Sequence, residues 1–361
     1  MTLHPLVGHE AQREKVLRAL REDRLPQVIL ITGPRGVGKQ RFALWAGEAL
    51  LCETLEARPC GSCRACRQVR GLGHPDLHWV MPVPRPKASD PEKQLEELAE
   101  TIGAVVEERR RQPLFLGGDG LAGHFVATAR LLQRRASLTP AAGTRKVFIV
   151  AEAERLVPQE SSPEAANALL KLLEEPPADT HFLLTTVDPG RLLPTIRSRA
   201  VPLRLGRLPD AVVEQFLATY AGLAGEELRR RVEMARGAIG LGVMPDDAQA
   251  RPVQAAAEFL AAVRRGSGSR MERAFKQGTW AARSDFSAML DAVAEALADA
   301  VRGASGGTPR RPVPEALRDC ADLAALVTAE YRVAAAREAA QGNVNPQLLL
   351  ATLGEDLAEV L

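Results

Sequence analysis

A strand, a glycine-rich loop and a helix in direct succession constrain the fold of this chain most. Residues 28–32 read Val-Ile-Leu-Ile-Thr, a short apolar run typical of a parallel strand that is buried on both faces. The next residues, 33–40, fit the pattern G-x-x-x-x-G-K, and residues 39–51 predict a helix. Glycines let backbone N–H groups approach phosphates, and the helix N-terminus adds partial positive charge. The sequence therefore predicts a phosphate-binding βα unit.

The loop is predicted to bind a nucleotide through its backbone and through the amine of Lys39. Its predicted nucleotide-binding residues are Gly33, Pro34, Arg35, Gly36, Val37, Gly38, Lys39 and Gln40. A Ser or Thr hydroxyl normally follows the lysine and holds magnesium, but Gln40 stands there. We therefore expect ATP or ADP as the ligand of the loop, without a well-held Mg²⁺.

The second half of a magnesium site normally comes from an acidic residue at the end of a later strand. The candidate strand, residues 146–150, is followed by Ala151 and Glu152. A methyl side chain cannot hold magnesium, so the charge that develops on a transferred phosphoryl group would go uncompensated. Glu152 stands where it could polarise an attacking water, as the remnant of a catalytic pair. The sequence predicts nucleotide binding without fast hydrolysis.

Four of the five cysteines lie within fifteen residues, which is a metal-binding spacing: Cys52, Cys60, Cys63 and Cys66. Four thiolates suit tetrahedral zinc, and no open ligand position suggests catalysis, so the zinc is expected to be structural. An iron–sulfur cluster and a redox-active pair stay open as alternatives, because both use closely spaced cysteines.

The remaining patterns predict an α/β fold followed by helices. Strands are expected at residues 77–81, 146–151 and 182–187, separated by helical patterns, which favours a parallel sheet. Beyond them, residues 209–243 predict a small group of helices and residues 250–361 an all-helical domain.

Residues 82–123 are rich in Pro, Lys and Glu and predict an insertion on the surface. Within them, a charged helix over residues 90–111 ends in Arg109, Arg110 and Arg111. These arginines could contact DNA or a partner. A solvated helix face is the favoured interpretation.

Composition excludes some classes of protein. Lys and Arg number 47 against 45 Asp and Glu, a formal charge of +2, which is too balanced for gripping many phosphates through a global positive field. The apolar runs fall far short of the roughly 20 residues that span a bilayer, and the first residues lack the pattern of a secretion signal. We expect no membrane segment and a cytoplasmic location.

Several stretches in a fixed order carry a family resemblance. They are residues 6–10 (Leu-Val-Gly-His-Glu), the loop at 33–39, the cysteine module, residues 165–177 (Ala-Ala-Asn-Ala-Leu-Leu-Lys-Leu-Leu-Glu-Glu-Pro-Pro), 182–189 and 192–199. Together the stretches resemble clamp-loader subunits of the AAA+ class, nearest to the delta-prime type of bacterial DNA polymerase III. The resemblance covers about residues 5–205.

The resemblance implies three domains. A RecA-like AAA+ domain would span residues 1–205 and hold a zinc module at 52–66 besides the insertion at 82–123. A small helical lid would follow at 206–248. An all-α collar domain for pentamer assembly would complete the chain at 249–361.

The resemblance also implies roles for particular residues. Arg199 matches the arginine that such subunits supply in trans to a neighbour's site, where its planar charged fork suits a γ-phosphate; a surface salt bridge is the alternative. Thr186 matches a polar sensor of that phosphate, and Val7 lies in a stretch implied to contact the nucleotide. In the lid, Gly240 or Leu241 stands where motor subunits present an arginine.

The function that follows is a delta-prime-like subunit that supports ATP-driven loading of a sliding clamp onto primed DNA without hydrolysing ATP itself. Its implied partners are the motor subunits (gamma/tau) and delta in a hetero-pentamer, and indirectly the clamp and primer–template DNA. The alternative is a hydrolysing gamma/tau-like motor, favoured by the intact loop and Glu152. A zinc-dependent nucleic-acid module is a lesser alternative, because no aromatic residue is interleaved with the arginines around the cysteines.

Overall fold

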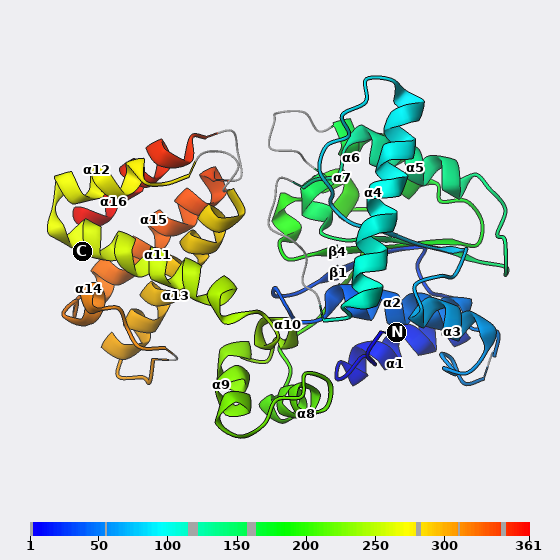
Figure 1. Ribbon diagram of the computed structural model, residues 1–361, viewed down its shortest axis with the longest axis horizontal. Helices are drawn as coiled ribbons and strands as arrows, with labels where there is room; N and C mark the ends of the chain where they lie inside the picture. The colour runs from blue at the N-terminus through cyan, green and yellow to red at the C-terminus, as the bar shows by residue number, and fades with distance from the viewer. Residues whose placement is uncertain are drawn as a thin grey trace. The chain divides into compact units, whose positions relative to one another are not determined.

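The computed structural model describes residues 3–54, 56–114, 122–156, 164–278, 283–309, 311–340 and 344–361. The described residues up to Met244 form one compact unit, and those from Pro245 onward form a second. Both are labelled by element in Figure 1. None of the described helices is both long and apolar enough to cross a membrane.

The first unit is built on a five-stranded parallel sheet with the strand order β2-β3-β4-β1-β5. Its strands are β1 (Val28–Thr32), β2 (Leu77–Val80), β3 (Lys146–Val150), β4 (Thr180–Thr186) and β5 (Val201–Arg204). Leu30 on β1 lies opposite Leu184 on β4, so the central strands bring apolar runs into register. The predicted parallel α/β fold is confirmed.

One strand of the sheet, β5, was not predicted. It is an edge strand whose residues are mostly exposed, and it contains Pro202, which donates no hydrogen bond. The strand therefore lacks the buried apolar run that reveals the central strands.

Helices cover both faces of the sheet, above and below it in Figure 1. The helices of this part are α1 (Glu10–Arg21), α2 (Lys39–Leu51), α3 (Arg64–Arg70), α4 (Pro91–Arg111), α5 (Val126–Ala136), α6 (Glu164–Glu174) and α7 (Pro194–Arg197). The side chains of α1 and α2 pack on Ile29 and Ile31, whereas those of α4, α5 and α6 pack on Val28 and Leu30. Alternate residues of β1 thus serve two separate cores, as the period of a strand requires.

The segment predicted as a surface insertion contributes to the core. Helix α4 buries one face in the cluster that includes β1 and β3, through Leu95, Leu98 and Ile102. Their spacing of three and four residues is that of one helix face. Residues 115–121 of this insertion lie outside the described residues.

The arginines at the end of α4 only partly follow the prediction of a solvated face. The Arg109 guanidinium lies 5.3 Å from the ring centroid of Trp79, and Arg110 Nη2 donates to the carbonyl of Leu72 at 3.2 Å. Arg111 is exposed. Its Nε lies 3.5 Å from Glu107 Oε1 on the same helix, so residues of this chain contact all three arginines.

Three short helices complete the first unit and occupy the region predicted to be helical: α8 (Asp210–Tyr220), α9 (Gly225–Ala235) and α10 (Ile239–Gly242). They share a small apolar cluster that includes Leu208, Val213 and Phe216. The division of the chain into three domains stays a prediction.

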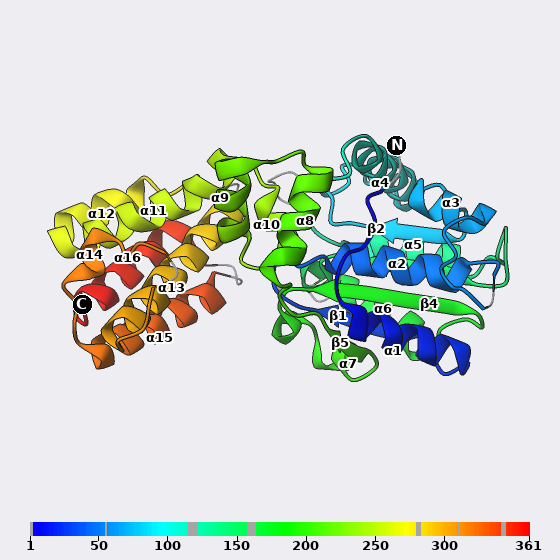
Figure 2. The same ribbon diagram turned by 90° about the horizontal axis from the view of Figure 1, so that it is seen from below.

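The regular elements among the described residues of the second unit are all helices, as predicted for this part of the chain. Its helices, labelled in Figure 2, are α11 (Asp246–Arg265), α12 (Ser267–Phe275), α13 (Arg283–Ala304), α14 (Glu315–Arg318), α15 (Leu323–Ala339) and α16 (Pro346–Ala358). They enclose one core around Phe259, Phe286 and Leu353.

Candidate nucleotide and metal sites

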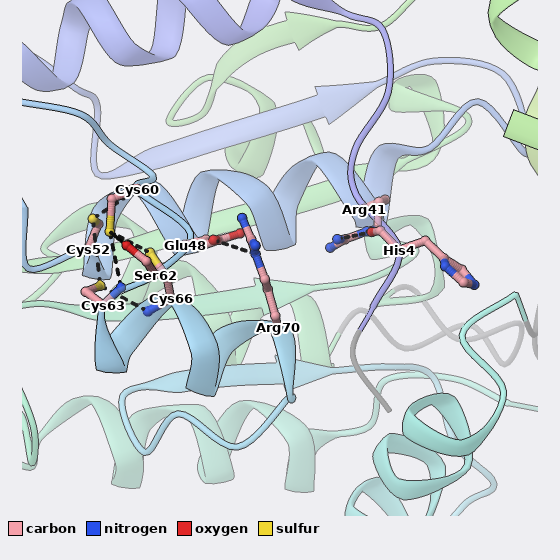
Figure 3. Close-up of polar contacts among 9 residues, drawn as sticks. All are labelled: His4, Arg41, Glu48, Cys52, Cys60, Ser62, Cys63, Cys66 and Arg70. Atoms are coloured by element: carbon pink, nitrogen blue, oxygen red, sulfur yellow. Dashed lines mark hydrogen bonds and ion pairs between the residues drawn. The ribbon is translucent and has the colours of Figure 1, made fainter. Parts of the chain in front are cut away.

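The four clustered cysteines converge as their spacing predicts. Their sulfur atoms all lie within 4.8 Å of one another, with Cys52 Sγ 4.0 Å from Cys63 Sγ and Cys60 Sγ 4.0 Å from Cys66 Sγ. Figure 3 shows the four side chains pointing toward one another. Tetrahedral zinc with bonds of about 2.3 Å requires sulfurs about 3.8 Å apart. The donor set therefore fits a metal ion.

Backbone amides support thiolate character in this cluster. The N–H of Cys60 donates to Cys52 Sγ at 3.4 Å, and the N–H groups of Cys63 and Cys66 donate to Cys60 Sγ and Cys63 Sγ at 3.3 Å each. Hydrogen bonds, foremost one with Thr54, lower the pKa of Cys60 to about 5. The lowered pKa favours the thiolate of Cys60, the form that binds metal, whereas burial raises the pKa of Cys52 and of Cys66. The cluster is thus a site that can bind a metal ion.

The phosphate loop joins β1 to α2, and its glycines are required by the backbone. Gly33, Gly36 and Gly38 have φ angles of +152°, +76° and +100°, in the region that L side chains rarely adopt. A Cβ at Gly33 would lie 2.5 Å from the carbonyl oxygen of Leu205, beside the sheet edge. The glycines of the loop are therefore needed for two reasons: their positive φ angles and, at Gly33, the close approach of the Leu205 backbone.

Lys39 is folded over this loop. Its Nζ donates to the carbonyls of Gly33 and Pro34 at 2.8 Å each. Burial lowers the pKa of Lys39 to about 8, opposed by the charges of Glu154 and Glu152. A bound phosphate would favour the charged amine, so the lysine is placed to respond to an anion. Next to it, Gln40 Oε1 is buried and accepts no hydrogen bond from the described residues.

The first residue after β3, Ala151, has no side-chain atom that could bind magnesium. Ala151 is fully buried, and its carbonyl lies 2.7 Å from His124 Nε2. Glu152 turns to Arg155, with Oε2 2.8 Å from Nε, while its backbone N–H donates to Thr185 Oγ1 at 3.1 Å. The carboxylate predicted to polarise water is thus engaged elsewhere in this structure.

A second carboxylate, Glu154, belongs to the site and was missed from the sequence. It lies on a 3-10 turn (Ala153–Leu156) and is 4% exposed, and its Oε1 accepts from the N–H of Val187 at 3.4 Å. Burial raises the pKa of Glu154, and a hydrogen bond with Thr186 counters this. The alternation of Ala and Glu over 151–154 was a signal that could have revealed it.

The predicted sensor Thr186 is the last residue of β4. Its hydroxyl accepts from the N–H of Asp188 at 3.1 Å and also hydrogen-bonds Glu154. The structure therefore brings the loop, Lys39, Glu154 and Thr186 to the same carboxyl-terminal edge of the sheet, where ligands of parallel sheets bind.

The short helix α10 contacts the loop. The N–H of Gly240 donates to the carbonyl of Gly36 at 2.9 Å, and a Cβ at Gly36 would lie 3.0 Å from the nitrogen of Leu241. The position predicted to lack an arginine thus lies directly on the loop. Val7, predicted to contact nucleotide, packs against the apolar cluster of α8.

Arg199 follows α7 and is paired within its own chain. Its Nη2 lies 2.5 Å from Glu174 Oε1, and its Nη1 donates to the carbonyl of Thr195 at 2.8 Å. The side chain is 32% exposed. Arg199 thus forms the kind of salt bridge that was given as the alternative to a role in trans.

The parallel sheet with a glycine-rich loop of the phosphate-binding pattern after β1, the cysteine module after α2 and the helices beyond define a RecA-like α/β fold. The family model described as "DNA polymerase III, delta subunit" matches residues 8–209, more than half of the chain. The chain belongs to this family.

Similar curated proteins carry related names. The chain is 31% identical to DNA polymerase III subunit delta' of Bacillus subtilis over 207 residues, which cover 56% of this chain and 50% of that one. It is 34% identical to subunit delta' of Pseudomonas aeruginosa, over 48% of this chain and 40% of that one. DNA polymerase III subunit tau of Salmonella typhimurium is 30% identical over 63% of this chain and 28% of its own length. The matches therefore span half or less of these relatives. The predicted delta-prime resemblance is confirmed.

Proposed function

We propose that this chain is a delta-prime-type subunit of the bacterial replicative clamp loader and supports ATP-driven loading of the sliding clamp onto primed DNA. In this role it does not hydrolyse ATP. The observation that carries the non-hydrolysing role is Ala151, a buried methyl group at the strand end where a magnesium ligand is needed. The match over residues 8–209 supports the family role.

The residues around the loop favour holding a nucleotide over cleaving it. Loop N–H groups and Lys39 would bind the phosphates of ATP or ADP. Glu152 would have to leave Arg155 before it could act on a water. Without a ligand at Ala151, Mg²⁺ is not held, so no cation offsets the charge that develops during phosphoryl transfer.

Arg199 is proposed to complete the site of a neighbouring motor subunit. In this role the Arg199 guanidinium breaks its ion pair with Glu174 and binds the γ-phosphate at the neighbour's site instead. A partly exposed ion pair of this kind is worth about 0–1 kcal/mol, so releasing it costs little. An arginine finger is worth about 10³ to 10⁵ in turnover, which leaves a large net gain.

The proposed partners are the gamma/tau motor subunits and delta in a hetero-pentamer, with the clamp and primer–template DNA contacted through the assembly. Residues 1–205 would be the AAA+ domain, 206–248 the lid and 249–361 the collar that assembles the pentamer. Zinc is the proposed metal of the cysteine module, in a structural role, and the cytoplasm the proposed location.

The test is clamp- and DNA-stimulated ATP turnover by the cognate motor subunits and delta, reconstituted with this chain. Arg199→Ala should reduce the turnover of the complex by at least about tenfold, whereas Arg197→Ala, an exposed arginine two residues away, should not. Lys39→Ala should have a much smaller effect than Arg199→Ala. Equal turnover with wild type and Arg199→Ala would refute the finger.

A hydrolysing motor is the second candidate, favoured by the complete Gly33–Lys39 loop and by the match to a tau subunit. The two candidates differ in what the isolated chain does. ATP turnover by this chain alone at the rate of the motor subunits would favour the motor, and an inert chain that stimulates the complex favours the proposed role.

A further inference from the structure

Residues 3–9, called the strap here, precede α1 and are tied to the cysteine module. The N–H of Leu3 donates to the carbonyl of Arg70, the last residue of α3, at 3.0 Å. One residue later, the carbonyl of His4 accepts from Arg41 Nε at 2.6 Å and from Nη2 of the same guanidinium. Figure 3 shows Arg41 reaching His4 from α2. The backbone of the strap is therefore fixed by two arginines on two helices.

The same strap reaches the short helices and the phosphate loop. The His4 ring lies 4.8 Å from the ring of Tyr220 on α8. At the other end, His9 Nε2 is 3.0 Å from the carbonyl oxygen of Val37 in the loop. Gly8 has so little space that a Cβ there would lie 2.4 Å from Leu208. The strap thus connects three parts of the first unit.

Helix α3 is the link between the metal ligands and the strap. Cys63 is its N-cap, Cys66 lies in its first turn and Arg70 is its last residue. A seven-residue helix is far below the length of about 12–15 residues at which isolated helices become marginally stable. Its stability must come from tertiary contacts: the cysteine cluster at its first turn, Arg70 at its last residue, and the buried side chains of Ala65 and Val69 between them.

An ion pair between a buried carboxylate and a half-exposed arginine joins the end of α3 to α2. Arg70 Nε lies 2.9 Å from Glu48 Oε1, and the Glu48 side chain is 4% exposed. Glu48 also hydrogen-bonds Cys66, and its charge acts on Arg41, the residue that holds His4. Figure 3 shows Glu48 between the cysteine cluster and Arg70. The Glu48 carboxylate therefore links the metal ligand Cys66 to Arg41 and Arg70, the two arginines that hold the strap.

We propose that metal bound by the four cysteines anchors the strap, through α3 and the Glu48–Arg70 pair, against the phosphate loop and α8. Metal at one end fixes the first turn of α3, and the last residue of α3 fixes Leu3. When the metal leaves, α3 frays, Leu3 loses its acceptor and the strap separates from Val37 and Tyr220. The role of Glu48 is positional, and the coupling does not depend on the clamp-loader role.

The first test is hydrogen exchange of the full chain, loaded with zinc and after removal of the metal by a chelator. Exchange over residues 3–9 should be at least tenfold faster without metal, while β3 and β4 keep their protection. Unchanged exchange in the strap after confirmed loss of metal would overturn the proposal. Equal loss of protection in β3 and β4 would also overturn it, because the metal would then hold the whole unit.

The second test distinguishes the effect of Glu48 on the strap from the effect of the metal. Zinc-loaded Glu48→Gln should keep its metal and still show several-fold faster exchange in the strap. Glu92→Gln, a matched change in an exposed pair with Arg134, should not. Exchange identical to wild type in Glu48→Gln would refute the role of Glu48. If Glu48→Gln does not fold, Arg70→Lys tests the same pair.

A third readout follows the strap directly. Burial, together with the charge of Arg41, lowers the pKa of His4. If chelation frees the strap, the pKa of His4 measured by NMR should rise toward its ordinary value. A His4 pKa that is the same with and without metal would contradict release of the strap.

Discussion

The cysteine module and the phosphate loop are both recognised by spacing, yet they differ in how much of their chemistry the spacing contains. The module has all four donors within fifteen residues, and its sulfurs converge within 4.8 Å. The loop pattern of residues 33–39 is complete, whereas the groups proposed to decide hydrolysis are Gln40 directly after it and residues of β3, β4 and the helices after β5. A complete loop pattern at Gly33–Lys39 can therefore belong to a nucleotide site whose other groups, from distant parts of the chain, are incomplete.

The difference has a physical basis in sequence distance. Donors a few residues apart meet through local turns, whereas Lys39 and Glu154 meet because the sheet brings β1 and β3 to one edge. In the proposed function, Ala151 at the end of β3 deprives the site of a magnesium ligand, although the loop itself keeps its full pattern.

The largest effect is expected from Cys63→Ser, which removes a metal donor and changes the N-cap of α3. Structural zinc contributes about 10–16 kcal/mol to folding in small zinc peptides, so loss of one thiolate should release the metal and unfold the module. Metal content should fall from about one equivalent toward none, with a lower melting temperature. The control is Cys320→Ser, outside the cluster. Retained metal at an unchanged melting temperature would show that the module is not the metal site.

Acid should destabilise the sheet edge beside Ala151. Burial lowers the pKa of His124 to about 4. The unfolded chain then binds more protons than the folded chain between about pH 6.5 and 4, so the free energy of unfolding falls as pH decreases through this window, by up to about 3 kcal/mol.

Urea unfolding of wild type and His124→Gln at pH 7 and pH 5 measures this effect. His78 and His181 act in the same direction, since burial lowers the pKa of each to about 4, so the variant should lose only part of the dependence. Metal content is followed in parallel, because acid also protonates cysteines. An identical pH dependence in the variant would contradict the assignment.

A smaller effect is expected where α10 meets the loop. Gly36→Ala places a side chain at a φ of +76° and 3.0 Å from the nitrogen of Leu241, which should cost about 2 kcal/mol. Gly38→Ala, at a φ of +100° with no atom within 4 Å, carries the conformational cost alone. Gly36→Ala should therefore have a lower melting temperature than Gly38→Ala, and faster hydrogen exchange in α10. Equal effects would mean that the contact with Leu241 adds nothing.

The smallest effect tests whether the distributed site can be completed. Gln40→Thr combined with Ala151→Asp restores a hydroxyl and a carboxylate where magnesium is normally held. Nucleotide affinity of the double variant should rise about tenfold on adding Mg²⁺, or about 1.4 kcal/mol, whereas the wild type should show little change. The two single variants are the controls. A double variant indifferent to Mg²⁺ would show that these two positions do not explain the difference between loop and module.

Much of the fold and part of the site were predictable from local patterns. The buried runs of β1, β3 and β4 and the four cysteines each carry their signal within a few residues, and the structure confirms them. Edge strand β5 was missed because exposed residues carry no such signal. The core-facing side of α4 was misjudged because its charged residues dominated the pattern.

By itself the sequence determined the phosphate loop, the metal donors and the helical character of the second unit, because each depends on residues near one another along the chain. Only the tertiary structure decided which polar groups are buried together. It placed Glu154 beside Lys39, Glu48 between Arg41 and Arg70, and Gly240 on Gly36. Burial and pairing across elements depend on distances in space, and the packing of apolar faces on the sheet sets those distances.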